Sequence, residues 1–159
     1  MARVLGLAVI CQLPYNMVMT GSLLYMTRLN PVFATVMCMV MLYFFRTYPG
    51  KTGKNVLLKL VAFIGVYLWS NMLGVDHGAC CVILCAVLWL LRGRNNMQTF
   101  IGIAVMFACS IFSMFYMAGV LSFLALHFYE GNKGVENRLM NYLAYPVILV
   151  ACGALMVVM

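Results

Sequence analysis

Acidic residues are what this sequence has least of: three Asp and Glu occur among 159 residues, and charged residues make up only 8% of the chain. Soluble domains carry about 25% charged residues, which keep their surfaces dispersed in water. Hydrophobic residues make up 66% of the chain, and the mean hydropathy is +1.04. This composition excludes a soluble enzyme, a nucleic-acid-binding module and a secreted disulfide scaffold. It indicates a membrane protein: a channel, a transporter, an intramembrane enzyme or an assembly factor.

Metal-binding motifs are also missing. The sequence has neither a CxxC motif nor a Cys/His pair at zinc spacing, and His77 beside Cys80 and Cys81 is a weak metal signal. We therefore expect no metal and no nucleic-acid partner. The cysteines all lie inside apolar stretches, so we expect them to pack as small apolar residues. They are Cys11, Cys38, Cys80, Cys81, Cys85, Cys109 and Cys152.

Apolar runs separated by short polar segments recur along the chain. A membrane-spanning helix needs about 20 apolar residues, so we predict one all-α integral membrane domain over 1–159, a polytopic transmembrane helix bundle of about seven spans. The run 99–129 is too long for one upright helix at about 1.5 Å per residue, so we expect it to divide near 115–119; six spans are the alternative. The first helix should bend or end near Pro14, and Pro31 suits the first turn of the second. The predicted spans are 2–25, 30–45, 55–73, 80–91, two within 99–129, and 139–158.

Basic residues predict the orientation of these spans. A cytoplasmic N-terminus places eight of the ten Lys and Arg in the cytoplasm, namely Arg3, Arg46, Lys51, Lys54, Arg92, Arg94, Lys133 and Arg138. Only Arg28 falls outside, and Lys59 lies one turn inside the third span, from where it can reach back toward the preceding basic loop. The same arrangement places the 14–29 segment and the turn at Asp76 and His77 together on the outer face.

Asp76 and His77 are the only adjacent acid and imidazole in the chain. Ionisable groups near the membrane core are energetically costly, so their presence suggests a function. A histidine can act as a general base, and a carboxylate can fix its tautomer and stabilise its charged form. We predict that His77 and Asp76 are catalytic. The alternative is an ordinary turn, which Gly74 and Gly78 also favour.

Two further polar segments stand out. Gln12, Tyr15 and Asn16, with Asn30 nearby in the chain, are best explained as hydrogen-bonding links between helices. Binding is the alternative for this group.

The second segment, EGNKG at 130–134, places Lys133 between Gly131 and Gly134. Backbone N–H groups and the ammonium could hold a phosphate there. The segment lacks P-loop spacing, so a plain cytoplasmic turn is the alternative.

Taken in order, these polar segments resemble the TraX family of bacterial inner-membrane proteins. The matching stretches are AVICQLPYN (8–16), LNPVFATVM (29–37), the DHG turn (76–78), LHFYEGNKG (126–134) and MNYLAYPVILV (140–150). Their order and spacing extend over nearly the whole chain. The family usually has further N-terminal spans, so the resemblance implies that this chain corresponds to the later part. The family also has a histidine where this sequence has Ile148.

TraX proteins of conjugative plasmids are associated with N-terminal acetylation of pilin in the inner membrane, with acetyl-CoA as donor. The resemblance therefore implies a multi-pass acyltransferase of the bacterial inner membrane that acts on a membrane-inserted, pilin-type protein. His77 with Asp76 would supply the base on the outer side. Lys133, Gly131 and Gly134 would hold the CoA phosphates on the inner side.

Two other functions are compatible with the sequence. In a non-catalytic membrane scaffold or pilus-assembly factor, the polar clusters would only join helices. A small-solute transporter is less favoured, because the sequence shows neither an internal repeat nor paired broken helices in its two halves.

Overall fold

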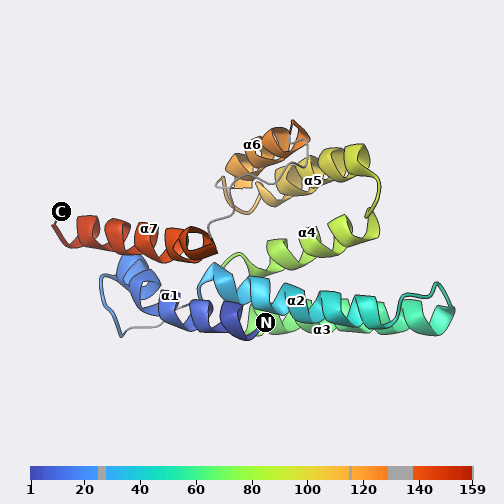
Figure 1. Ribbon diagram of the computed structural model, residues 1–159, viewed down its shortest axis with the longest axis horizontal. Coiled ribbons are helices and arrows are strands. Elements are labelled where there is room, and N and C mark those ends of the chain that lie inside the picture. Colours follow the sequence, from blue (N-terminus) through green and yellow to red (C-terminus); the bar gives the residue numbers. More distant parts are fainter. Residues whose placement is uncertain (25–27, 115, 129–137, 159) are drawn as a thin grey trace.

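The computed structural model describes residues 1–24, 28–114, 116–128 and 138–158. These residues form seven α-helices and one isolated parallel bridge between Leu29 and Val75 (Figure 1). The prediction of an all-α chain is confirmed. The helices are α1 (Ala2–Thr20), α2 (Pro31–Thr47), α3 (Gly53–Met72), α4 (Gly78–Leu90), α5 (Asn95–Cys109), α6 (Tyr116–His127) and α7 (Arg138–Val158).

The two prolines near the N-terminus occupy different positions in their helices. Pro31 occupies the first turn of α2, as expected, and the side chain of Asn30 caps this helix by accepting the N–H of Val32 at 3.0 Å. By contrast, α1 does not end at Pro14 but continues to Thr20. It stops at Gly21, whose left-handed backbone (φ 68°) lets its N–H donate to the Met17 carbonyl.

The long run 99–129 divides into two helices, as predicted. Helix α5 ends at Cys109, a few residues before the expected division, and it begins at Asn95, inside the expected loop. The hydroxyl of Ser110 donates to the Phe107 carbonyl at 2.6 Å. A serine that bonds a nearby carbonyl offers the backbone an alternative to continuing the helix, which accounts for the earlier break.

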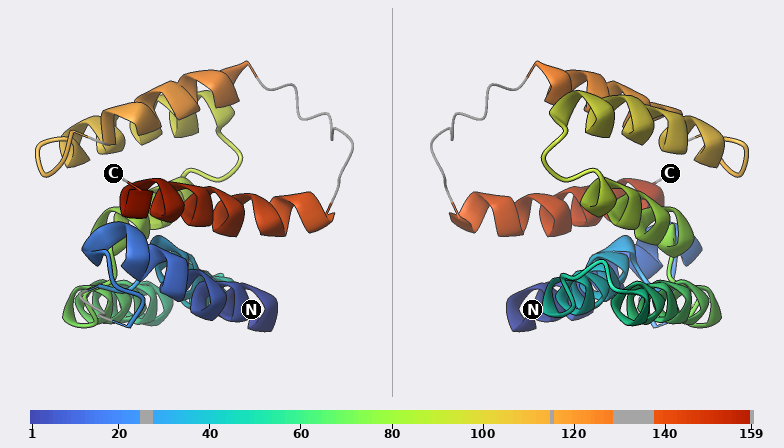
Figure 2. Two further views of the ribbon diagram at one scale, coloured as in Figure 1. Left: turned by 90° about the vertical axis from the view of Figure 1, so that its left-hand side faces the viewer. Right: turned by 90° about the vertical axis from the view of Figure 1, so that its right-hand side faces the viewer.

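The helices lie in three layers, which Figures 1 and 2 show from three directions. Helices α1, α2 and α3 form one layer, α4 and α7 the middle layer, and the α5–α6 pair the outer layer. Helices α2, α3 and α4 pack against one another, and α7 packs against α1. The main apolar core lies between α2 and α4 and consists of Cys38, Met41, Phe45, Val82 and Ala86.

Helices α5 and α6 form an antiparallel hairpin with close helix–helix contact. Phe123 of α6 lies over Gly102, and Met106 of α5 lies over Gly119. Met106, near the end of α5, thus contacts Gly119, near the start of α6, as expected for two antiparallel helices. Glycines at such positions let two helices approach closely, as in membrane helix pairs.

Two helices among the described residues, α1 and α3, are long and apolar enough to cross a membrane. Helix α3 has 20 residues, and only 6% of its apolar window is buried. In water such a helix would expose a large apolar surface, whereas lipid matches it. Shorter apolar helical stretches lie at Pro31–Thr47, Gly78–Leu90, Asn96–Cys109, Tyr116–Ala125 and Tyr142–Ala154.

Candidate functional site

A backbone bridge forms the base of the candidate site. The N–H of Leu29 donates to the Gly74 carbonyl at 3.1 Å, and the N–H of Asp76 donates to the Leu29 carbonyl at 2.8 Å. Gly74 has a φ of 61°, which a glycine adopts without strain. The bridge joins the segment before α2 to the turn before α4, which agrees with the prediction that these two segments lie on the same side of the bundle.

Buried amides fix the same segment to α1. Gln12 accepts the backbone N–H of Asn30 at 3.0 Å and donates to the Arg28 carbonyl at 2.9 Å. The Asn30 amide donates to the Ala8 carbonyl at 2.7 Å and to Gln12 at 3.1 Å, and Gln12 also donates to Asn16 at 2.8 Å. These contacts agree with the interpretation of Gln12, Asn16 and Asn30 as links between helices.

The carboxylate of Asp76 is the centre of the site, with 12% of its side chain exposed. One oxygen accepts the Tyr15 hydroxyl from α1 at 2.6 Å and lies 3.5 Å from Nε2 of His77. The other oxygen lies 3.4 Å from Nη1 of Arg28, whose side chain is 61% exposed. Tyr15 and Arg28, from separate parts of the sequence, and the neighbouring His77 thus surround this carboxylate.

The imidazole of His77 connects this carboxylate to α6. Its Nδ1 lies 2.7 Å from the hydroxyl of Tyr116, and the two rings meet edge to face at 5.1 Å. His77 precedes α4 with a φ of 56°, a left-handed conformation that is costly for most residues with a side chain and persists only where the surroundings enforce it. The next residue, Gly78, lies so close to Ser70 that a Cβ would come within 3.1 Å of it.

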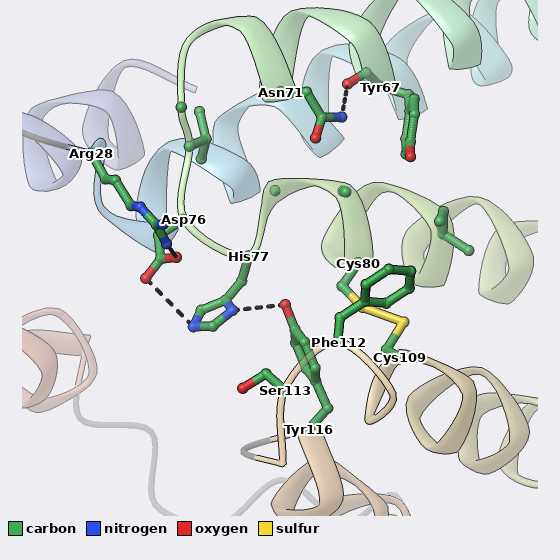
Figure 3. A pocket seen from close by; sticks show the side chains of 15 residues that line it. Arg28, Tyr67, Asn71, Asp76, His77, Cys80, Cys109, Phe112, Ser113 and Tyr116 are labelled. Atoms are coloured by element: carbon green, nitrogen blue, oxygen red, sulfur yellow. Dashed lines mark hydrogen bonds and ion pairs between the residues drawn. A yellow bond between two sulfur atoms is a disulfide. The ribbon is translucent and has the colours of Figure 1, made fainter.

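An open cavity of about 690 Å³ lies between α3, α4 and the α5–α6 turn, and Asp76, His77 and Tyr116 form part of its wall (Figure 3). A disulfide between Cys80 of α4 and Cys109 of α5 lies in its wall, with the two Cα atoms 6.5 Å apart. The expectation that all cysteines pack as apolar residues was therefore wrong for these two. The first turn of α4 meets the last turn of α5, a contact that the sequence does not show. The free cysteines are Cys11, Cys38, Cys81, Cys85 and Cys152.

The arrangement provides a path for a proton. With the Nε2 proton directed at the Asp76 carboxylate, the Nδ1 lone pair of His77 accepts the Tyr116 hydroxyl. A carboxylate that orients a histidine and stabilises its charged form is the usual support for a general base. The hydroxyl of Tyr116 lies in the cavity wall, where it can pass a proton from a bound group to His77.

The structure brings the two predicted catalytic residues, Asp76 and His77, into one site. The predicted phosphate-binding residues, Lys133, Gly131 and Gly134, lie outside the described residues.

No local motif in the sequence marks Tyr116, which reaches the site through the fold of α5 and α6. Arg28, by contrast, does have a signal in the sequence. It is the one basic residue predicted outside, and Asp76 is the one acid there.

Comparisons of this chain with protein-family models, with curated proteins and with solved structures give no match. Within the part of the chain that the structure describes, no three His, Cys, Asp or Glu side chains gather in an arrangement that would hold a metal ion. The geometry of the Asp76 site is therefore the main evidence on function.

Proposed function

We propose that the chain is an integral membrane protein with seven spans and a cytoplasmic N-terminus. The exposed apolar surface of α3 and the uneven distribution of basic residues support membrane insertion and this orientation. The α5–α6 hairpin supports the count, because a hairpin returns the chain to the side on which it started. Arg94 and Arg138 then lie on the same side.

The disulfide gives independent support for the orientation. Disulfides persist in the bacterial periplasm and are rare in the cytosol. Cys80 and Cys109 lie at the ends of α4 and α5 that the charge distribution places outside. Two unrelated signals, charge and cysteine oxidation, therefore favour the same side of the inner membrane for the Asp76 site.

Reporter fusions test this topology. Fusions after Lys54, Arg94 and Lys133 should report a cytoplasmic position, and a fusion after Asp76 a periplasmic one. A periplasmic signal at Lys133 would contradict the seven-span count. A cytoplasmic signal at Asp76 would contradict the orientation.

We further propose that the protein is a TraX-like acyltransferase that N-acetylates a membrane-inserted, pilin-type protein. The observation that carries this proposal is the series Tyr15, Asp76, His77 and Tyr116 beside the cavity. Hydrogen bonds join Tyr15 to Asp76 and His77 to Tyr116, and Nε2 of His77 lies 3.5 Å from the Asp76 carboxylate. The amine nitrogen of the substrate attacks the thioester carbonyl of acetyl-CoA, a C–N bond forms and the C–S bond breaks. The amine proton passes to Tyr116, whose own proton passes to Nδ1 of His77, and the departing thiolate finally takes one proton.

The donor's phosphates need cations that the Asp76 cavity does not offer. Arg28 is the one Lys or Arg among the residues that line it, and its guanidinium lies against Asp76. The proposal therefore places the phosphates of acetyl-CoA on the cytoplasmic side, at Lys133 between Gly131 and Gly134, with the basic loop of Arg46, Lys51 and Lys54 as the alternative. It also requires a path between the two faces along which the pantetheine arm of acetyl-CoA brings the intact thioester to the Asp76 cavity.

Mass spectrometry tests the activity directly. A pilin-type membrane protein co-expressed with this chain should gain one acetyl group at its N-terminus, and the same protein expressed alone should not. An unmodified N-terminus in both samples would contradict the acyltransferase proposal.

A non-catalytic scaffold is the second candidate, and one observation favours it. Among the described residues, every buried side-chain N or O atom has a hydrogen-bond partner within the chain. Such a satisfied network suffices to join helices without any ligand. Acetyl-CoA binding by the purified full chain separates the two candidates, because a scaffold has no reason to bind it.

A further inference from the structure

A second cavity lies at the other end of the α2–α3–α4 unit, away from Asp76. It is a groove of about 500 Å³ between the end of α2, the first half of α3 and the second half of α4. Its wall is almost wholly apolar, with Lys51 and Lys59 as its two charged members. The apolar residues are Phe45, Val56, Leu60, Phe63, Ile83, Ala86, Val87 and Leu90.

We propose that this groove binds an anionic phospholipid, with an acyl chain along the apolar wall and the phosphate at Lys51 and Lys59. The inference shares the premise of membrane insertion with the proposed function but does not depend on acyl transfer. Apart from Ile83, which lines both cavities, it assigns a ligand class to residues that the Asp76 site does not use.

The wall suits an acyl chain. Val56 and Leu60 of α3 are each 52% exposed, so the groove is open on the side where α3 presents its apolar surface. A lipid chain that enters from this side replaces contact with bulk lipid by contact with Phe63 and Leu90. Because bulk lipid is as apolar as the groove, no hydrophobic gain drives this exchange, and binding depends on how well the acyl chain fits the shape of the wall.

The charged end suits a phosphate. The ammonium of Lys59 donates to the Gly50 carbonyl at 3.3 Å, which holds it against the loop between α2 and α3. A lysine ammonium has three donors, so two remain for a phosphate oxygen, and the ammonium of Lys51 comes from the same loop. No acidic residue lines the groove. Charge complementarity therefore favours an anionic headgroup over a zwitterionic one, because a zwitterionic headgroup carries a positively charged group that the two lysines would repel.

The position of the lysines agrees with this ligand. Lys51 lies in the loop that the charge distribution places at the cytoplasmic interface, and Lys59 reaches back to that loop from α3, as the sequence predicted. A phosphate at this depth lies at the level of the lipid headgroups, and the groove extends from there toward the middle of the membrane. The acyl chain and the phosphate of one lipid thus match the two parts of the cavity.

Native mass spectrometry of the full chain in detergent tests the ligand class. Phosphatidylglycerol should bind at least about 10-fold more tightly than phosphatidylcholine with the same acyl chains, because two charge-assisted contacts distinguish them. Equal binding of the two lipids would overturn the proposal. Inorganic phosphate at millimolar concentration should not displace phosphatidylglycerol; full displacement would indicate a free-phosphate site and would also overturn it.

Paired variants test whether the phospholipid binds in this groove. The double change Lys51→Ala with Lys59→Ala should lower phosphatidylglycerol affinity about 10-fold or more, whereas Arg3→Ala with Arg94→Ala removes the same charge outside the groove and should have little effect. Leu60→Asn should weaken binding several-fold, whereas Leu57→Asn, at a similarly exposed site outside the groove, should not. Equal effects within either pair would overturn the proposed site. The leucine pair keeps the test valid if the lysine variant does not fold.

Discussion

The two ends of the α2–α3–α4 unit are built differently. At the Asp76 end, side chains from α1, the 28–30 segment, the 74–77 turn and α6 meet through directed hydrogen bonds, and a disulfide joins α4 to α5. At the Lys51 end, apolar packing around Met41 and Phe45 joins the helices, and exposed cations surround them. Hydrogen bonds are thus concentrated at the Asp76 end, where the positions of the side chains must be fixed, whereas apolar packing holds the Lys51 end together.

Asn30→Ala should have the largest effect on stability. Asn30 is fully buried, caps α2, and donates to Ala8 and Gln12. Its loss removes a helix cap and leaves buried acceptors unpaired, so we expect the free energy of unfolding to fall by about 3–5 kcal/mol. Equilibrium unfolding of the protein in detergent measures this free energy. Asn71→Ala is the control, because Asn71 is exposed and bonds only its own helix; similar losses in both variants would refute the role of the buried network.

Cys109→Ser should have the next largest effect. The disulfide closes a sequence separation of 29 residues, and removal of such a bridge costs about 2–4 kcal/mol. Cys152→Ser, at an exposed free cysteine, should leave unfolding unchanged. A reducing agent should lower the stability of the wild type to that of Cys109→Ser and should not affect the variant. Insensitivity of the wild type to reduction would show that the bridge does not stabilise the site.

Gly102→Ala should destabilise the α5–α6 hairpin by about 1–3 kcal/mol, because the new methyl group meets the ring of Phe123. The matched change is Gly65→Ala in the middle of α3, where the space around the glycine is open. There alanine should stabilise the helix by up to about 1 kcal/mol through its higher helix propensity. Thermal unfolding of the two variants compares them, and equal shifts would contradict close packing of α5 on α6.

Arg28→Ala should have the smallest effect, below about 1 kcal/mol. The guanidinium is mostly exposed, lies 3.4 Å from Asp76 and is screened by solvent. The buried amides, not this ion pair, then account for the stability of the Asp76 end. A loss as large as that of Asn30→Ala would reverse this ranking.

The sequence predicted much of the fold, because apolar runs, turn residues and prolines are local signals. It predicted seven helical segments, Pro31 in the first turn of α2, and the reach of Lys59 back to its loop. It also predicted that the 14–29 segment and the turn at Asp76 and His77 share one face of the bundle, and the structure brings Tyr15 and Leu29 into contact with that turn. Tyr116 and the Cys80–Cys109 bridge could not be predicted, because both depend on how α5 and α6 pack against α4.

The acetylation rate of His77→Asn tests the central claim most directly, when it is measured beside the stability of the same sample. Asparagine tolerates the left-handed backbone at this position, so stability should change by less than about 1 kcal/mol. Loss of the base should lower the rate about 10²-fold or more. Tyr116→Phe should lower it without adding to the effect of His77→Asn, and Tyr67→Phe, in the same cavity wall, should not. An unchanged rate in His77→Asn would contradict the account and would leave Asp76 and His77 as a link between helices.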